Sequence, residues 1–117
     1  MADRNDIEIA NNSAWAGTFT LRGADGQPRN ITGATFEMDI RRKADDADPP
    51  IATLTTANGR AALSATPTDG RVNILIPLAI AQAILPGLYE HDMIMTIGGI
   101  TERVWYGSLR VVQGVSR

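Results

Sequence analysis

The sequence predicts an all-β fold, an antiparallel β-sandwich, and three observations support this prediction. Residues 34–43 alternate strictly, with Phe36, Met38 and Ile40 on one side and polar residues between them. A period of two over this length is typical of a strand with one buried face and one solvated face. Several other segments repeat the pattern, with turn dipeptides between them. Eleven glycines and six prolines in 117 residues also suit a fold with many turns.

Two strands are predicted before this segment. A short strand covers residues 7–9, and a longer one covers residues 14–22, whose apolar face carries aromatic side chains. Gly17 falls on that apolar face, so it marks either a bulge or a close approach. The pair Asp25-Gly26 then gives a turn. The side chains expected to point inward from these two strands are Ile7, Ile9, Trp15, Phe19 and Leu21.

The middle of the chain is predicted to contain a loop and three strands. An exposed loop is expected over residues 44–50, because Pro49 and Pro50 cannot continue a central strand. Asn58-Gly59 is a strong hairpin signal, since both residues tolerate positive φ. This turn is therefore expected to join two short strands. Together with a cleanly alternating strand further on, they cover residues 51–56, 61–65 and 71–77.

One short helix is predicted at residues 78–85. Pro77 can open this helix, and Pro86-Gly87 ends it. Three of its side chains are expected to cover one end of the sandwich: Leu78, Ile84 and Leu85.

The last two strands, 88–97 and 101–112, are expected to pair through Gly98-Gly99 in the longest hairpin. The second strand is apolar on both faces around its middle, and Gly107 is predicted to hold a bulge there. Adjacent aromatic residues at positions 105 and 106 point to opposite faces, so one of them is expected to be exposed or at an interface. The predicted interface residues are therefore Val104, Trp105 and Tyr106.

Seven or eight strands at these spacings are typical of a sandwich. The connection that ends in Pro86-Gly87-Leu88-Tyr89 is similar to a corner of immunoglobulin-like sandwiches, where a tyrosine bonds back to the backbone. We therefore interpret the fold as immunoglobulin-like, with Tyr89 as a candidate tyrosine corner and a simple packing tyrosine as the alternative. One domain fits residues 1–117.

Composition excludes several classes of function. The formal net charge is −2, with acidic and basic residues interspersed, which gives no reason to bind nucleic acid. Without cysteine the chain can form neither disulfides nor a thiolate metal site, as expected for a protein that folds in a reducing cytosol. The sequence shows no signal peptide and no run of about 20 apolar residues, so neither export nor a membrane span is expected.

No catalytic constellation is visible. His91 is the only histidine and falls on the apolar face of its strand. None of the serines lies in a nucleophile-elbow motif. We therefore interpret His91 as a packing residue and expect a protein that is not an enzyme and has no cofactor.

Two further groups of residues carry side chains of the kinds that bind ligands. The acidic cluster Asp45, Asp46 and Asp48 lacks the glycine and the ligand spacing of a calcium loop, so we interpret it as a solvated loop and predict no metal site. Four aromatic residues could form a platform for sugars, as some sandwich domains do, although the core is expected to take several of them. They are Trp15, Tyr89, Trp105 and Tyr106.

Several segments, taken together, resemble a known group of proteins. The group comprises small phage and prophage proteins similar to the N-terminal β-sandwich domain of phage baseplate upper proteins and related tail-associated proteins. The resemblance covers roughly residues 14–113 and rests on turns and alternating strands. The segments are ITGATFEMDIRRKADD, PIATLTTANGR, DGRVNILIP, LPGLYEHDMIM and TERVWYGSLRVV.

This resemblance implies a structural, non-enzymatic role in a phage or prophage tail or baseplate, as an assembly or adaptor domain. The implied partners are other phage structural proteins or copies of the chain itself, with no nucleic acid and no membrane. The implied location is the virion, after synthesis in the bacterial cytoplasm. The resemblance supplies no catalytic residues. The alternative function is a β-sandwich module that binds a glycan or a host surface.

Overall fold

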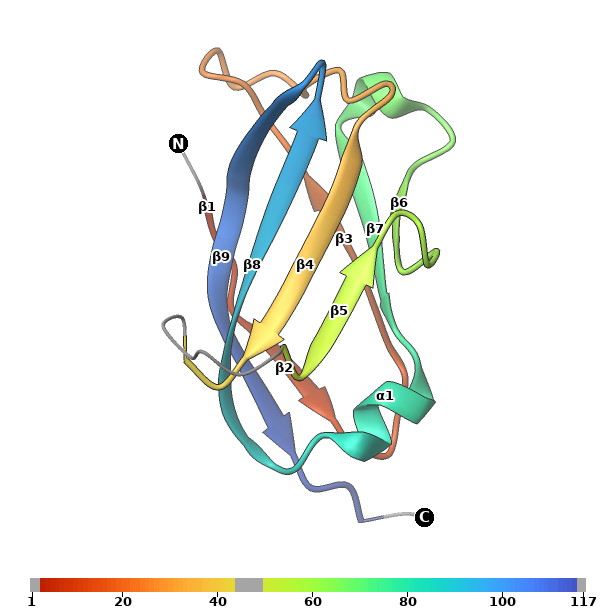
Figure 1. Cartoon of the computed structure of the whole chain (residues 1–117), viewed down its shortest axis with the longest axis vertical. Helices are drawn as coiled ribbons and strands as arrows, with labels where there is room; N and C mark the ends of the chain where they lie inside the picture. The colour runs from red at the N-terminus through yellow and green to blue at the C-terminus, as the bar shows by residue number, and fades with distance from the viewer. Residues whose placement is uncertain (1–2, 44–49, 116–117) are drawn as a thin grey trace.

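Two β-sheets pack face to face in the computed structural model, which describes residues 3–43 and 50–115 (Figure 1). The all-β sandwich that the sequence predicts is confirmed. The elements in chain order are β1 (Asp3–Arg4), β2 (Ile7–Ala10), β3 (Trp15–Thr20), β4 (Thr35–Arg41), β5 (Ala52–Thr55), β6 (Ala61–Leu63), the 3-10 turn η1 (Pro67–Asp69), β7 (Arg71–Ile76), α1 (Leu78–Ala83), β8 (Gly87–Ile97) and β9 (Ile100–Val112).

The large sheet has the strand order β1-β9-β8-β4-β5, and β2 also pairs with β9. Both β1 and β2 run parallel to β9, so the prediction of a purely antiparallel protein is wrong at this edge. Residues 3–10, here named the N-terminal arm, extend the sheet beyond the last strand of the chain. The arm is held in part by burial, because Ile7 and Ile9 lie in the core opposite Leu109 and Val111 in the ladder.

The small sheet has the antiparallel order β3-β7-β6. Asn58-Gly59 forms a turn, but the predicted hairpin is wrong, because β5 belongs to the large sheet and β6 to the small one. The Asn58 carboxamide oxygen accepts hydrogen bonds from the backbone N–H groups of Thr55 and Arg60, at 2.9 and 3.1 Å. These bonds reverse the chain, and the pairing of Ala61 with Ile74 then directs it to the other layer.

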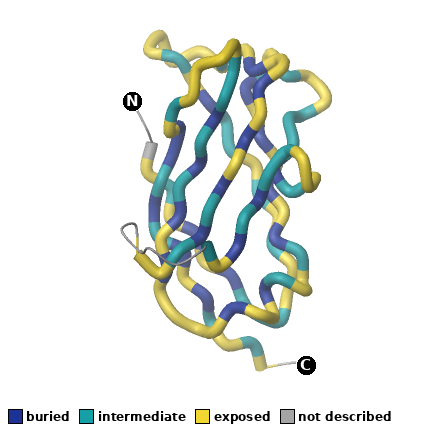
Figure 2. The backbone as a smooth tube through the Cα atoms, viewed as in Figure 1, coloured by how far each residue is buried: buried dark blue, intermediate teal, exposed yellow. Residues whose placement is uncertain are grey.

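The core lies between the two sheets, and burial alternates along the strands (Figure 2). Phe36, Met38 and Ile40 are buried as predicted, and so are the inward residues of β7. An aromatic series crosses the core, in which Phe19 lies 4.6 Å from Trp105 and 6.4 Å from Trp15, centroid to centroid.

Gly17 marks a close approach and not a bulge. It pairs regularly with Ile74 of β7. The indole ring of Trp15 folds back over it, and a Cβ at position 17 would overlap that ring. The glycine therefore makes room for a side chain of its own strand.

One end of the sandwich is closed by α1 and the residues after it. Of the three side chains predicted to cover this end, only Ile84 is buried, together with Ala81. Leu78 and Leu85 are exposed, because α1 has six residues and ends before the predicted boundary, so only a narrow face meets the core.

The β8–β9 hairpin turns at Gly98 and Gly99, which have φ values of 58° and 79°. Two positive φ values in a two-residue loop suit the right-handed twist of the flanking strands. The bulge in this hairpin falls at Val104, where the register shifts between Met93 and Ile94, and the prediction of a bulge at Gly107 is wrong. The extra residue turns both Val104 and Trp105 toward the interior.

Candidate functional site

The structure separates the three predicted interface residues. Val104 and Trp105 are only 4% and 1% exposed, so the prediction that they form an interface is wrong for both. The bulge is the reason, because it places two consecutive side chains in the core. Tyr106 alone of the three faces outward, where it is partly exposed on the large sheet.

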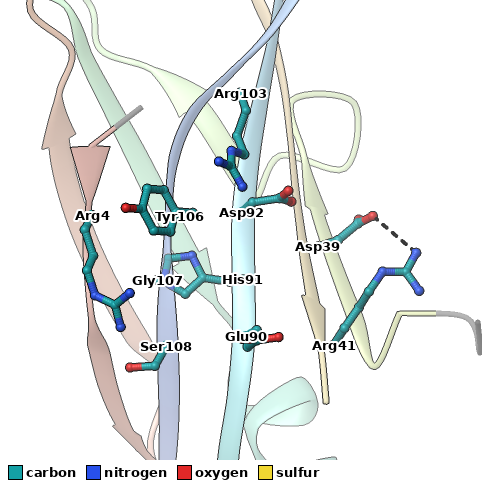
Figure 3. Close-up of a pocket in the computed structure, with 10 residues that line it drawn as sticks. All are labelled: Arg4, Asp39, Arg41, Glu90, His91, Asp92, Arg103, Tyr106, Gly107 and Ser108. Carbon is teal, nitrogen blue, oxygen red and sulfur yellow. Dashed lines mark ion pairs between the residues drawn. The ribbon is translucent and has the colours of Figure 1, made fainter. Parts of the chain in front are cut away.

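Tyr106 borders a shallow depression on the outer face of the large sheet (Figure 3). The depression has a volume of about 170 Å³ and lies across β1, β9, β8 and β4. Charged side chains dominate its rim because strict alternation sends every second residue of these strands outward. The lining residues are Arg4, Asp39, Arg41, Glu90, His91, Asp92, Arg103, Tyr106, Gly107 and Ser108.

Two guanidinium groups lie against the Tyr106 ring. The Arg103 guanidinium carbon is 4.7 Å from the ring centroid, and that of Arg4 is 5.8 Å away. Both distances are within the range of cation–π attraction. Arg4 also forms an ion pair with Asp6 at 3.2 Å, whereas Arg103 forms none within residues 3–43 and 50–115. Arg103 is therefore a cation presented on an aromatic surface without a carboxylate.

The opposite side of the depression is acidic. Asp39 of β4 and Asp92 of β8 are direct partners in the antiparallel ladder, an arrangement that places like charges side by side. Asp39 accepts a hydrogen bond from the Thr53 hydroxyl at 3.1 Å and lies 3.9 Å from Arg41. Asp92 has no ion pair within the described part of the chain. The face thus carries an unneutralised carboxylate close to an unneutralised guanidinium.

His91 lies beneath this face and is 4% exposed. Its Nε2 is 2.7 Å from the carbonyl oxygen of Asn5, which can only accept, so Nε2 carries the proton. Its Nδ1 is buried without a hydrogen-bond partner among the described residues. Burial lowers the pKa of His91, because a charged imidazolium would lose its hydration there. His91 is therefore a neutral packing residue that also holds the N-terminal arm.

Ser108, His91 and Asp92 line one depression, but they do not form a catalytic relay. The Ser108 hydroxyl donates to Asp6 at 3.2 Å, and His91 donates to a backbone carbonyl. A nucleophile and its base need a hydrogen bond to each other, and here both groups bond elsewhere.

The four aromatic residues considered as a sugar platform do not gather on one surface. Tyr89 and Trp105 are buried, and Trp15 packs against the core through Phe19. Only Tyr106 belongs to the outer face of the large sheet. The acidic cluster at Asp45, Asp46 and Asp48 lies outside the described residues. Within the described ranges, no group of three or more histidine, aspartate or glutamate side chains is placed to hold a metal ion.

Tyr89 makes the bond expected of a tyrosine corner, because its hydroxyl donates to the carbonyl of Leu85 at 2.6 Å. The bond fixes the backbone between α1 and β8. It also holds two exposed leucines on an ordered corner, Leu85 at 69% exposure and Leu88 at 68%. Leu88 is paired with Arg110 in the ladder and so belongs to the same outer face as Tyr106.

Sequence reasoning missed Arg4 and Arg103 as members of this site. The outward positions of Tyr106, Ser108 and Arg110 follow from simple alternation in β9. Arg103 lies on the other side of the bulge, so its orientation could not be counted along the strand. Arg4 reaches the site only through the parallel pairing of β1 with β9, for which the sequence gives no local signal.

Neither the protein-family models nor the curated protein sequences give a match to this chain. Among solved structures, the chain is similar to the N-terminal domain of phage TP901-1 ORF48, with a TM-score of 0.50 and 12% identity, over 92% of this chain and 84% of that one. It is also similar to an uncharacterised protein from Bacillus anthracis str. Ames, with a TM-score of 0.45 and 14% identity, over 97% of this chain and 85% of that one.

The chain is an all-β protein of two packed sheets with a charged, partly aromatic outer face. A domain of a phage protein shares its fold over most of both chains.

Proposed function

We propose that this chain is a non-enzymatic structural protein of a phage or prophage particle, acting as an assembly or adaptor domain of the tail or baseplate. The proposal is supported by one observation above all, the fold likeness to the N-terminal domain of phage TP901-1 ORF48 over 92% of this chain. Because one fold serves many functions, the surface of the chain must also suit the role.

The outer face of the large sheet suits binding to another protein. It presents Tyr106 and Arg103, residue types that are enriched at the centres of protein interfaces. The exposed Leu88 adds apolar area to the same face. The side chains rise from paired strands, so the backbone loses little conformational freedom when a partner binds.

In this role the chain would act by assembly and would use no cofactor. Its partners would be other phage structural proteins or copies of itself, and it would be a virion component made in the bacterial cytoplasm. The alternative role in attachment to a glycan lacks support from the four aromatic residues, because Tyr89 and Trp105 are in the core.

The proposal is tested on particles induced from the bacterium that carries the gene. We expect mass spectrometry of purified particles to detect the chain at a constant ratio to the major tail proteins. Gold-labelled antibody against the chain should decorate the tail and not the capsid. A cytosolic protein of similar abundance is the control for carry-over. Particles with a full set of tail proteins and no trace of this chain would overturn the proposal.

A further inference from the structure

The charges on the outer face of the large sheet are separated into two sides. The side formed by β1, β2 and β9 carries Arg4, Arg103 and Arg110, and the acids Asp6 and Glu8 form ion pairs with Arg4 and Arg110. The side formed by β8 and β4 carries four outward acids and one outward base. These are Glu37, Asp39, Glu90, Asp92 and Arg41.

Apolar groups lie between and beside these charges. Tyr106 is the ladder partner of Asp92, Ile94 is the partner of Arg103, and Leu88 is the partner of Arg110. These three rows across β9 and β8 each combine a large side chain with a charge. Among the bases named on this face, Arg103 is the one without an ion pair in the described part of the chain, and among the acids Asp92 and Glu37 have none. An apolar centre with complementary charges around it is the usual composition of a protein interface.

We infer that this face binds a second copy of the same chain, across a two-fold axis that runs along the strands between β8 and β9. This rotation lays β9 of one copy over β8 of the other, so the basic side of each copy meets the acidic side of its partner. A two-fold interface uses one patch twice and must be self-complementary, as this face is. The inference rests on the proposed function in one respect, since it names the partner that assembly would use.

The pairing of β9 with β8 shows which residues would meet across this axis. With the rotation above, Tyr106 faces Asp92 of the other copy. Arg103 faces Ile94 of the other copy, which lies two residues along β8 from Asp92. The arginine side chain is long enough to cover the distance from Ile94 to Asp92. The Arg103 guanidinium therefore reaches the Asp92 carboxylate of the other copy. Arg103 and Asp92, which have no ion pair within one copy, are then paired between copies. This contact occurs twice because the axis is two-fold.

A charge-swap experiment tests this inference. Sedimentation velocity over a concentration series measures the dimer dissociation constant of the wild type, of Arg103→Glu and of Asp92→Lys. Each single variant brings like charges together twice and should weaken the dimer by a factor on the order of ten or more. An equimolar mixture of the two variants restores both contacts, Glu with Lys and Arg with Asp. The mixture should therefore form a heterodimer although each variant alone stays monomeric.

The control variant is Arg71→Glu, which makes the same charge change on the outer side of the small sheet, where Arg71 is 60% exposed. It should dimerise as the wild type does. Circular dichroism should show that all variants keep the fold. Neither Arg103 nor Asp92 forms an ion pair in the described ranges, and the Arg71–Asp69 pair is a surface contact at 3.9 Å, which contributes little to stability.

Two results would overturn the inference. One is a wild type that stays monomeric at its highest soluble concentration. The other is a mixture of the two variants that dimerises no better than either alone. Neither result bears on the particle analysis, so the proposed function can stand when this inference fails. Conversely, a charge-dependent dimer that is absent from particles would retain the interface and reject the phage role.

Discussion

His91 donates a hydrogen bond of 2.7 Å from Nε2 to the carbonyl oxygen of Asn5, a residue 86 positions earlier in the chain. The bond passes over Gly107, the ladder partner of His91, where no side chain blocks it. Asp6 adds two bonds to β9, accepting from the backbone N–H of Ser108 at 3.0 Å and from its hydroxyl at 3.2 Å. The link between β1 and β2 is thereby fixed to the sheet by side chains as well as by the ladder.

Substitution of His91 by Phe should destabilise the protein. The ring volume is nearly kept, but the Asn5 carbonyl loses its donor in a partly buried site, which costs about 1–3 kcal/mol of unfolding free energy. Urea unfolding should show a lower midpoint with an unchanged slope. The outward neighbour serves as control, since Asp92→Asn, measured in dilute protein where the chain is monomeric, should change the free energy by less than about 0.5 kcal/mol. A His91→Phe variant as stable as the wild type would show that the bond to Asn5 is dispensable.

Stability should also depend on pH through His91. Burial lowers the pKa of His91 from its ordinary value of 6.5, so the unfolded chain takes up the proton first as the pH falls. The free energy of unfolding should therefore decrease below about pH 6.5 and continue to fall toward the folded pKa. The charges that act on the ring are Asp6 and Asp92, which raise its pKa, and Arg4, which lowers it. All three are weaker than the effect of burial.

The histidine effect can be separated from acid denaturation. Hydrogen bonds from Ser108 lower the pKa of Asp6, and a hydrogen bond from Arg29 lowers that of Glu102. Carboxyl groups with a lowered pKa stabilise the fold above their ordinary values of 3.8 and 4.5, and this stabilisation is lost only as the pH falls below them. Urea midpoints between about pH 7.5 and pH 5 should therefore decline in the wild type and stay level in His91→Phe. Parallel declines in both proteins would assign the effect to another group.

Gly107→Ala should loosen the N-terminal arm. A Cβ at position 107 would overlap the backbone carbonyl of Asn5, which cannot rotate away as a side chain could. Overpacking of this kind costs about 1–3 kcal/mol. Hydrogen exchange should show faster exchange of the β2 and β9 amides than of those in β7. Gly17→Ala is the matched control, because the atoms nearest to its Cβ would belong to the Trp15 ring, a side chain that can move, and it should cost less. Equal losses in both variants would contradict this account.

Local patterns in the sequence predicted the strands well and their partners poorly. Alternation placed Phe36, Met38 and Ile40 in the core correctly because a strand's period of two is a local property. The parallel pairing of β2 with β9 joins Ile7 to Leu109 across the length of the chain, and no local pattern encodes such a contact. The Asn58-Gly59 turn was predicted correctly for the same local reason, while the sheet that β6 joins was not.

The sequence predicted only part of the candidate site, because alternation is local whereas the position of the bulge depends on tertiary structure. Two adjacent aromatic residues in a strand must point to opposite faces, which correctly placed one of Trp105 and Tyr106 outside. The position of the bulge was the missing fact, because it decided that Val104 is buried with Trp105 and that Arg103 faces outward beside Tyr106. Bulge positions depend on the partner strand, here on Met93 and Ile94, and so on tertiary structure.

Tyr89→Phe should remove the corner bond and little else. The Tyr89 ring is buried and stays so, while the carbonyl of Leu85 loses a donor at 2.6 Å. A net loss of about 1 kcal/mol is expected, equivalent to a fall of about 4 °C in the thermal midpoint. Leu85→Ser is the matched control, because that side chain is 69% exposed and the backbone carbonyl is kept. It should leave the midpoint nearly unchanged. A Tyr89→Phe variant that melts with the wild type would show that the corner is held by packing of the ring alone.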